Sequence, residues 1–272
     1  MDWRELFPDA DYQFIVRLRR AAPSEFFGSQ DKSGLLLQER RHWLDKSPGH
    51  HLVVSEDAGP VVNEVARLVA GWNILPTNDP ESVLGGKEAS ATLRALGRTL
   101  EPDLVLLRRH EGMLRLAGGC VCFPSSWSLP EKAALSVDQI HAIVPGLNET
   151  IRSSIERFLA RMTPGLAWLR ANWGLSRSGE LNQNPWRRLP RLEAGLDPAG
   201  IFIRIEQQAL VRLPEVDGVL FGIRILTMPL SQFVQDPVAR TGLRRALSTM
   251  PDKVAEYKGI QAVREGICAW LR

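Results

Sequence analysis

The sequence predicts an α+β protein with an antiparallel sheet, and two observations carry that prediction. Apolar and polar residues alternate with a period of two in residues 200–214, which is typical of a strand with one buried face. The alternation returns in residues 219–226 after a turn at 214–218, so the two segments predict a hairpin. Segments with helical spacing of apolar residues flank these strands, which makes the class α+β.

The register of this hairpin follows from its apolar faces. A slip of one residue turns a strand over, so both apolar faces stay together only if paired residue numbers sum to an even value. Arg204, Glu206, Gln208 and Arg224 would then share one face of the sheet. Such a cluster is either a solvated ladder of side chains or a functional site, and the pattern leaves both open.

The N-terminal part, about residues 1–100, is expected to be helical. Three segments carry apolar residues at helical spacing: 35–44, 61–72 and 89–100. Residues 14–18 fit either a short strand or a helical turn, and residues 76–86 have the composition of a loop. This part should form a helical cap on the sheet.

Strand patterns dominate the central part, about residues 101–232. They are expected at 104–107, 113–123 and 166–173, ahead of the hairpin. Ser136 and Gln139 have the spacing of a capping box at the start of a short helix that ends near His141. Asn148 is expected to cap an amphipathic helix ending near Met162, with a buried stripe formed by Ile151, Ile155, Phe158, Leu159 and Met162. Two strands, two helices and three strands are the element order of a PAS-like domain.

Two helices, expected at 233–250 and 254–271, complete the chain as a C-terminal part of about residues 233–272. The segment 174–200 is irregular, and loops of this length are usually functional or mobile. We therefore expect one domain over residues 1–272, a PAS-like antiparallel sheet with inserted and flanking helices.

The composition excludes several classes of protein. A formal net charge of +3, spread evenly, argues against a nucleic-acid partner, and no apolar stretch approaches the 18 residues of a membrane span. No signal peptide is visible at the N-terminus. Cys120, Cys122 and Cys268 form neither a disulfide framework nor a zinc spacing, so a reducing cytoplasm is the expected location.

Among the five histidines, His141 has the strongest claim to chemistry because it lies between a capped helix and the Pro145-Gly146 turn. It could present an imidazole nitrogen to an iron, or it could be a hydrogen-bonded core residue. Trp173 precedes Gly174, where a large ring could close a pocket or simply pack in the core. No dinucleotide fingerprint, phosphate loop, zinc-protease motif or nucleophile elbow occurs.

The charged residues of the hairpin are open to two interpretations. Glu206 could act as a base or bind a cationic amine, because a carboxylate in a dry pocket attracts ammonium strongly. Arginines could bind carboxylates such as haem propionates. A salt bridge between Glu206 and either Arg204 or Arg224 would give the same pattern.

Five ordered motifs together resemble a known family. They are Leu116–Trp127, Glu131-Lys132, Ile140–Gly146, Arg170–Trp173 and Ile203–Pro214, and Phe221–Arg224 and Tyr257–Gly259 extend the match. As a set they are similar to the haem-dependent oxidative N-demethylase α-subunit-like family, over roughly residues 90–260.

The resemblance implies an oxidoreductase that holds haem b in a PAS-like fold. The family's activity is an iron-dependent, monooxygenase-like removal of a methyl group from a small secondary amine such as dimethylamine, with O2 consumed and formaldehyde released. Electrons come from NADPH through a separate flavin and iron–sulfur reductase, and folate-binding partner subunits take up the formaldehyde. The alternative is a non-catalytic PAS-like subunit that senses haem or a small molecule or is only structural.

Carried onto this chain, the resemblance makes His141 the iron ligand and Glu206 and Arg224 the catalytic candidates. Three residues become cofactor-binding candidates: Trp173, Arg204 and Arg212. The chain departs from the family's pattern at two positions. Gln207 replaces an arginine of the family, and Pro102 interrupts an acidic helix end.

Overall fold

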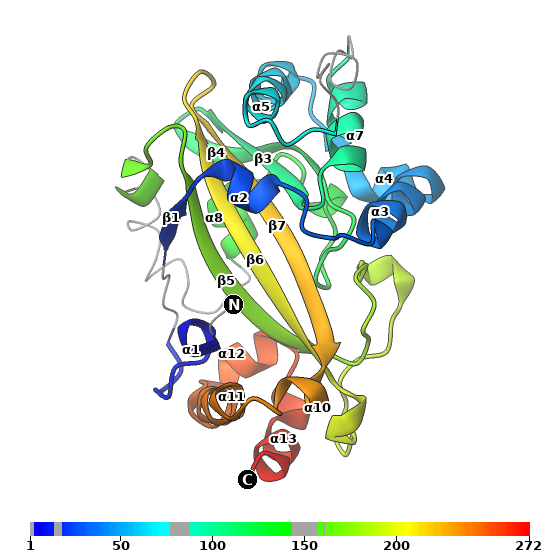
Figure 1. Ribbon diagram of the computed structural model, residues 1–272, viewed down its shortest axis with the longest axis vertical. Helices are drawn as coiled ribbons and strands as arrows, with labels where there is room; N and C mark the ends of the chain where they lie inside the picture. Colours follow the sequence, from blue (N-terminus) through cyan, green and yellow to red (C-terminus); the bar gives the residue numbers. More distant parts are fainter. Residues whose placement is uncertain (1–2, 14–17, 77–87, 143–156, 160) are drawn as a thin grey trace.

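The computed structural model describes residues 3–13, 18–76, 88–142, 157–159 and 161–272. It confirms the α+β class: helices surround a sheet of seven strands in the order β1-β5-β6-β7-β3-β4-β2, with every neighbouring pair antiparallel (Figure 1). The strands are β1 (Arg19–Ala21), β2 (Leu52–Val54), β3 (Asp103–His110), β4 (Met113–Cys120), β5 (Ala167–Ser176), β6 (Phe202–Leu213) and β7 (Gly218–Pro229).

Helices come from both ends of the chain. The N-terminal helices are α1 (Trp3–Leu6), α2 (Pro23–Phe27), α3 (Leu35–Lys46), α4 (Pro48–His51), α5 (Gly59–Gly71) and α7 (Ala89–Thr99). A short helix, α8 (Val137–His141), lies between β4 and β5. The C-terminal helices are α10 (Leu230–Phe233), α11 (Pro237–Thr249), α12 (Asp252–Tyr257) and α13 (Arg264–Trp270). No helix in the described part of the chain is both long and apolar enough to cross a membrane.

The register predicted for the central hairpin is wrong. Glu206 pairs with Ile225 and Gln207 with Arg224, so paired residue numbers sum to an odd value. Directly opposed residues share a face, and Arg224 therefore lies on the face opposite to Glu206. The prediction failed because β7 is apolar on both faces, so a slip of one residue does not expose a polar row to the core.

We call the side of the sheet that carries Arg204, Glu206 and Gln208 the cavity face, and the other side the helical face. The residues of β7 that pair with Arg204, Glu206 and Gln208 are Thr227, Ile225 and Ile223, and they also lie on the cavity face. The helical face carries Ile203 and Ile205 of β6. The two faces have different neighbours, and this difference positions the site.

Helices from both termini bury the helical face. Near one end, α2 packs so closely on β7 that a Cβ atom at Gly222 would lie 2.7 Å from the ring of Phe27. Near the other end, Ile203 and Ile205 belong to a second core cluster that includes Leu243 of α11 and Val254 of α12.

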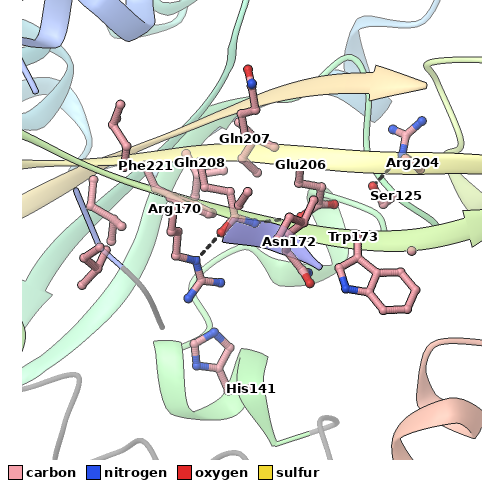
Figure 2. A pocket seen from close by; sticks show the side chains of 18 of the residues that line it. Ser125, His141, Arg170, Asn172, Trp173, Arg204, Glu206, Gln207, Gln208 and Phe221 are labelled. Atoms are coloured by element: carbon pink, nitrogen blue, oxygen red, sulfur yellow. Dashed lines mark hydrogen bonds between the residues drawn. The ribbon is translucent and has the colours of Figure 1, made fainter. Parts of the chain in front are cut away.

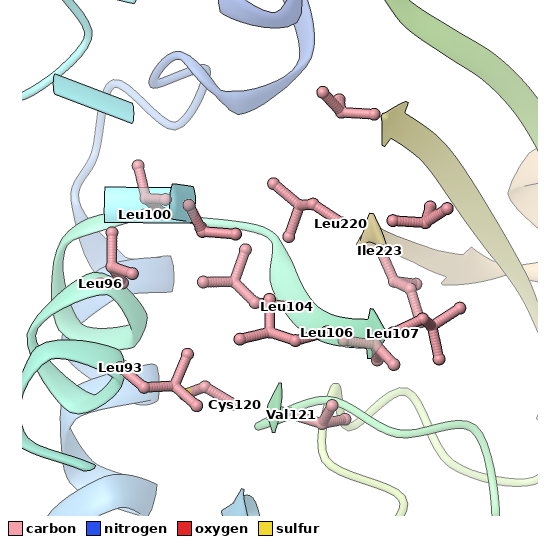
Figure 3. Packing of buried hydrophobic residues seen from close by; sticks show 14 of the residues in the cluster. Leu93, Leu96, Leu100, Leu104, Leu106, Leu107, Cys120, Val121, Leu220 and Ile223 are labelled. Atoms are coloured by element: carbon pink, nitrogen blue, oxygen red, sulfur yellow. The ribbon is translucent and has the colours of Figure 1, made fainter. Parts of the chain in front are cut away.

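At the β3-β4-β2 side of the sheet, α7 contributes Leu93 and Leu96 to the first core cluster. Figure 3 shows Leu93 and Leu96 of this helix directed toward Leu104 of β3 and Cys120 of β4. The sulfur of Cys120 needs the space that Gly97 leaves, because a Cβ atom there would be 2.1 Å away from it. The cysteine is thus a small core residue at this point.

The C-terminal part departs from the two expected helices. Asp236 caps α11 by accepting hydrogen bonds from the backbone N–H groups of Val238 and Ala239, so the helical run restarts after α10. Gly259 has a φ of +67°, a left-handed conformation that ends the helical run of α12 and separates α12 from α13. The strands β1 and β2 were not expected at all, because three residues carry too little periodicity to be recognised.

Several expected elements lie outside the described residues. They are the turn at 143–146, the start of the helix capped by Asn148 with Ile151 and Ile155, most of the loop at 76–86 and most of the segment 14–18. Phe158 and Leu159, from the expected buried stripe, are helical, and Leu159 and Met162 belong to the first core cluster. The helix α8 begins at the expected capping box, with Ser136 and Gln139 bonded to each other's backbone N–H.

Candidate functional site

A cavity of about 1630 Å³ runs along β5 and is bounded by the cavity faces of β6 and β7 on one side and by α8 on the other. It is larger than the roughly 300–1,000 Å³ that most small-molecule sites enclose. Apolar side chains from β3, β4 and β7 line its inner end, namely Val105, Leu107, Leu114, Leu116, Phe221 and Ile223. Polar lining residues come from β5, β6 and α8, shown closely in Figure 2, and also from the N-terminal part, which contributes Glu5, Asp11, Tyr12, Gln13, Arg19, Glu25 and Gln30.

His141 is the last residue of α8 and lines this cavity. Its Nδ1 atom is buried and has no hydrogen-bond partner among the described residues. Burial lowers the pKa of His141, and the positive charge of Arg170 lowers it further against the opposing effect of Asp138. The imidazole is therefore held neutral with a lone pair available, which is the form that binds metals.

Arg170 lies on the cavity face of β5 and faces His141 across the cavity (Figure 2). Its Nε donates to Gln208 Oε1 over 2.5 Å, and Gln208 Nε2 donates in turn to Glu206 Oε2 over 2.8 Å. An arginine, an amide and a carboxylate thus form a short hydrogen-bonded row across two strands. Loss of hydration lowers the pKa of Arg170, with Glu206 acting in the opposite direction.

A lysine that directly follows α12, Lys258, lies within the electrostatic influence of the carboxylate in this row. Lys258 Nζ donates to the Trp173 carbonyl over 2.7 Å and to Asn172 Oδ1 over 3.3 Å. Burial lowers the pKa of Lys258 to about 8, and the charge of Glu206 opposes the shift. Both residues line the cavity, so Glu206 lies in the combined field of Lys258 and Arg170.

Trp173 serves mainly as packing. Its ring contacts Phe7 at a centroid distance of 5.1 Å and lies 5.2 Å from Lys258 Nζ, and the side chain belongs to the second core cluster. It also lines the cavity at β5. Trp173 is thus a core residue at the border of the cavity, and its role as a cofactor-binding residue stays a prediction.

Arg204 lies in the cavity wall, but its guanidinium is already occupied by protein oxygens. Nε donates to Ser125 Oγ over 2.7 Å, and Nη1 donates to the Glu180 carbonyl over 3.2 Å. Nη2 donates to the carbonyls of Phe123 and Leu181, each over 2.7 Å. Arg204 therefore fastens two loops to β6, and burial lowers its pKa to about 10.

Arg212 and Arg224 are not brought to the cavity. Arg212 pairs with Asp217 in the turn between β6 and β7. Arg224 lies on the helical face, where it forms a buried ion pair with Glu101 and donates to the Phe26 carbonyl over 2.7 Å. The register found for the hairpin takes Arg224 to the helical face, whereas Arg212 is used in the turn by Asp217.

The two cysteines on β4 and just after it are buried beside another ion pair. Asp103 accepts hydrogen bonds from Arg40 and from the backbone N–H of Cys122, over 2.5 and 2.7 Å. Across the ranges that the structure describes, no group of three or more histidine, cysteine or acidic residues could hold a metal ion. Cys120 and Cys122 belong to the first core cluster and pack there.

Arg170 and Lys258 lie within the motifs of the resemblance but were not predicted as site residues. Arg170 could have been found from the alternation of β5, because Arg170 and Asn172 are two residues apart and therefore share a face. Lys258 lies on a different element, and nothing local to its sequence indicates that it reaches the edge of β5.

One comparison with known proteins bears on this geometry. The family described as "Haem-dependent oxidative N-demethylase, alpha subunit-like" matches residues 59–268, which include β3 to β7 and every residue of the cavity row. The match extends well beyond half of the sequence, and its description names a haem-dependent oxidative activity. The chain belongs to the haem-dependent oxidative N-demethylase alpha-subunit-like family.

Proposed function

We propose that this chain holds haem b between α8 and the cavity face of the sheet and uses it in the oxidative N-demethylation of a small amine. The observation that carries the proposal is the Nδ1 atom of His141, buried at a large cavity without a partner among the described residues. A buried polar atom of this kind needs an explanation. An iron-containing cofactor would explain this atom by binding to it. The residues that line the cavity fit haem, because they combine a neutral imidazole with apolar side chains.

In this proposal His141 is the iron ligand. Haem, when bound, supplies the redox chemistry that O2-dependent oxidation requires. The capping box of α8 fixes the helix that carries His141, and burial keeps its ring neutral. Apolar residues at the inner end of the cavity, such as Leu107, Leu116 and Phe221, would enclose the flat faces of the macrocycle.

Glu206 is the residue proposed to bind the substrate. A secondary amine such as dimethylamine is a cation at neutral pH, and its N–H groups can donate to a carboxylate. Gln208 orients the carboxylate by donating to Oε2, which leaves Oε1 for the amine. Ile223 lies beside Gln208 on β7 and would exclude water from the methyl groups.

The PAS-like part of the proposal rests on topology. The order β4-β3-β7-β6-β5 with α8 inserted between β4 and β5 agrees with the expected sequence of two strands, helices and three strands. Within this scheme, electrons reach the haem from NADPH through a separate flavin and iron–sulfur reductase. Partner subunits, one of which binds folate, take up the formaldehyde.

The test is an absorption spectrum of the purified protein after titration with haemin, oxidised and then reduced with and without carbon monoxide. We expect a Soret band that shifts on reduction and again with carbon monoxide. His141→Ala should lose that spectrum, whereas His110→Ala should keep it because His110 is exposed at the end of β3.

A spectrum left unchanged in His141→Ala would refute the ligand assignment and leave the family membership intact. If haem binds and no amine releases formaldehyde, the haem-sensor alternative replaces the demethylase. Glu206→Gln should keep haem and raise the KM for dimethylamine, because an amide lacks the negative charge that attracts the ammonium.

A further inference from the structure

Among the described residues three arginines are buried, and each has partners within the protein. Arg40 pairs with Asp103 and Arg224 with Glu101. Arg204 has no carboxylate partner in the described ranges but donates to oxygens through every nitrogen of its guanidinium. Arg170, which is half-buried, differs: in the described part of the chain its hydrogen bond is from Nε to the neutral Gln208, and it forms no salt bridge.

Lys258 is the second cation of this kind. Its partners are the Trp173 carbonyl and the Asn172 amide oxygen, both uncharged, and it forms no salt bridge within the described residues. Burial disfavours its charged form, as the lowered pKa of Lys258 shows. Lys258 is half-buried, and an ammonium group that is partly removed from water and has uncharged partners is stabilised most by an anion.

One carboxylate serves both cations only at a distance. Glu206 raises the pKa of Arg170 and of Lys258 through its charge, yet its hydrogen bond within the described residues is with Gln208. Where β5 and β6 meet the residue after α12, the cavity wall therefore carries Arg170 and Lys258 beside one carboxylate, Glu206. Two other carboxylates that line the cavity have their own cations, since Asp11 pairs with Arg245 and Glu25 with Arg19. If Glu206 also binds a cationic amine, as proposed above, neither cation is compensated.

We infer that Arg170 and Lys258 form a carboxylate-binding pair in this cavity, and that their ligands are the two propionate groups of the bound haem. This inference rests on the proposed function for the identity of the ligand. It assigns the carboxylates to residues other than Arg204 and Arg212, whose donors are used within the protein. Figure 2 shows the guanidinium of Arg170 directed into the space between β5 and His141.

The geometry suits this role. Gln208 holds Arg170 through Nε alone, which leaves the two Nη groups for bidentate binding of a carboxylate. Lys258 has three N–H donors and uses two of them, so one remains. Arg170 and Lys258 lie on either side of Asn172, which gives the two carboxylates separate cations.

The experiment compares haem with its dimethyl ester, which has the same macrocycle without the two negative charges. For the wild-type chain, the ester should bind about 10- to 100-fold more weakly, the range expected for losing hydrogen bonds to charged groups. Arg170→Met and Lys258→Met should each weaken haem binding and bring the two affinities closer together. Arg212→Met removes an arginine outside the cavity and should leave the ratio at its wild-type value.

A second arm identifies the source of the carboxylate. Thermal shifts of the haem-free and haem-loaded chain are compared for dimethylamine and N-methylglycine, which differ by a carboxylate. If haem and its ester bind alike but N-methylglycine stabilises the wild type and neither methionine variant, the pair binds a carboxylate of the substrate. That result would retain the pair and reassign its ligand.

Two outcomes separate this inference from the proposed function. Haem binding through His141, with equal affinity for the ester and no preference for N-methylglycine, would overturn the carboxylate pair and leave the proposed function standing. Failure to bind haem at all would refute the proposed function. In that case the N-methylglycine arm on the haem-free chain still decides the inference, and the absence of any effect of Arg170→Met or Lys258→Met overturns it.

Discussion

Replacing Glu101 by glutamine should destabilise the fold more than any other loss of a single charge on the helical face. Glu101 is 2% exposed and Arg224 is 4% exposed, so both charges of the pair are buried. The carboxylate accepts hydrogen bonds from Ser29 Oγ over 2.7 Å and from the backbone N–H groups of Gln30 and Asp31 over 3.0 Å, besides the Arg224 guanidinium. Removing one partner leaves the other charge buried without compensation.

The expected cost is about 3–5 kcal/mol, the usual loss when a buried ion pair is broken on one side. The charge of Arg224 would then face only neutral acceptors, namely the carbonyls of Phe26 and Gly28 at 2.7 and 3.1 Å and the amide oxygen of the substituted side chain. A domain is typically stable by roughly 5–15 kcal/mol, so the variant should retain its fold with a strongly lowered denaturation midpoint. Arg224→Met should give a similar loss, and the double variant should lose less than the sum of the two.

The assay is equilibrium unfolding in urea, with Glu215→Gln as the matched control. Glu215 also pairs with an arginine, Arg67, but both side chains are more than half exposed, so its loss should have little effect. A loss in Glu101→Gln that is no larger than in Glu215→Gln would refute the reasoning. Burial raises the pKa of Glu101, but the hydrogen bonds from Ser29, Arg224 and the backbone together lower it below its ordinary value of 4.5. The contribution of Glu101 is therefore present above pH 4.5 and is lost as the pH falls through the lower folded-state pKa.

Three further predictions concern the sheet, the loops and the lysine. Gly222→Ala should destabilise the protein by about 1–3 kcal/mol, because the added Cβ atom meets the ring of Phe27; thermal unfolding measures this, and an unchanged midpoint would contradict the packing described. Arg204→Met should make the loop that contains Leu181 more sensitive to limited proteolysis, since that loop loses its bond to β6, and an unchanged digestion pattern would argue against the clamp. The pKa of Lys258 is about 8 in the folded chain against 10.5 ordinarily, so the unfolded chain binds more protons between these values and stability should rise with pH there. Lys258→Met should lack this rise in urea unfolding curves, and a wild-type curve that is flat over the same range would contradict the assignment.

Local patterns predicted the order of the elements well. The capping box at Ser136 fixed the start of α8, and alternation located β6 and most of β7. Register was beyond local patterns, because Leu220 and Phe221 are apolar neighbours on opposite faces of β7 and either face could have been buried. The helices that arrive from both ends of the chain bury the helical face, and no single strand contains that information.

The site was predicted in part for the same reason. His141 and Glu206 reach one cavity, as their positions on α8 and β6 allowed. The partners of the arginines are distant in the sequence. Arg224 pairs with Glu101, 123 residues earlier. Arg204 donates to the carbonyls of Phe123 and Leu181, which lie 81 and 23 residues earlier. Residue type and alternation are identical for an arginine that binds a ligand and one that is used in the fold.

The long strand β5 has a further consequence for how copies of this chain meet. In the described residues β1 pairs with only three of its ten residues, from Ala167 to Leu169, so much of its outer edge lacks a neighbouring strand. Lys258 donates a hydrogen bond to the Trp173 carbonyl of β5 and places a positive charge at this edge. Charged groups at an open edge discourage a second chain from adding its own strand. A lysine that serves the cavity would thereby also guard against edge-to-edge aggregation, so chains that lose it should stay monodisperse for a shorter time at high concentration.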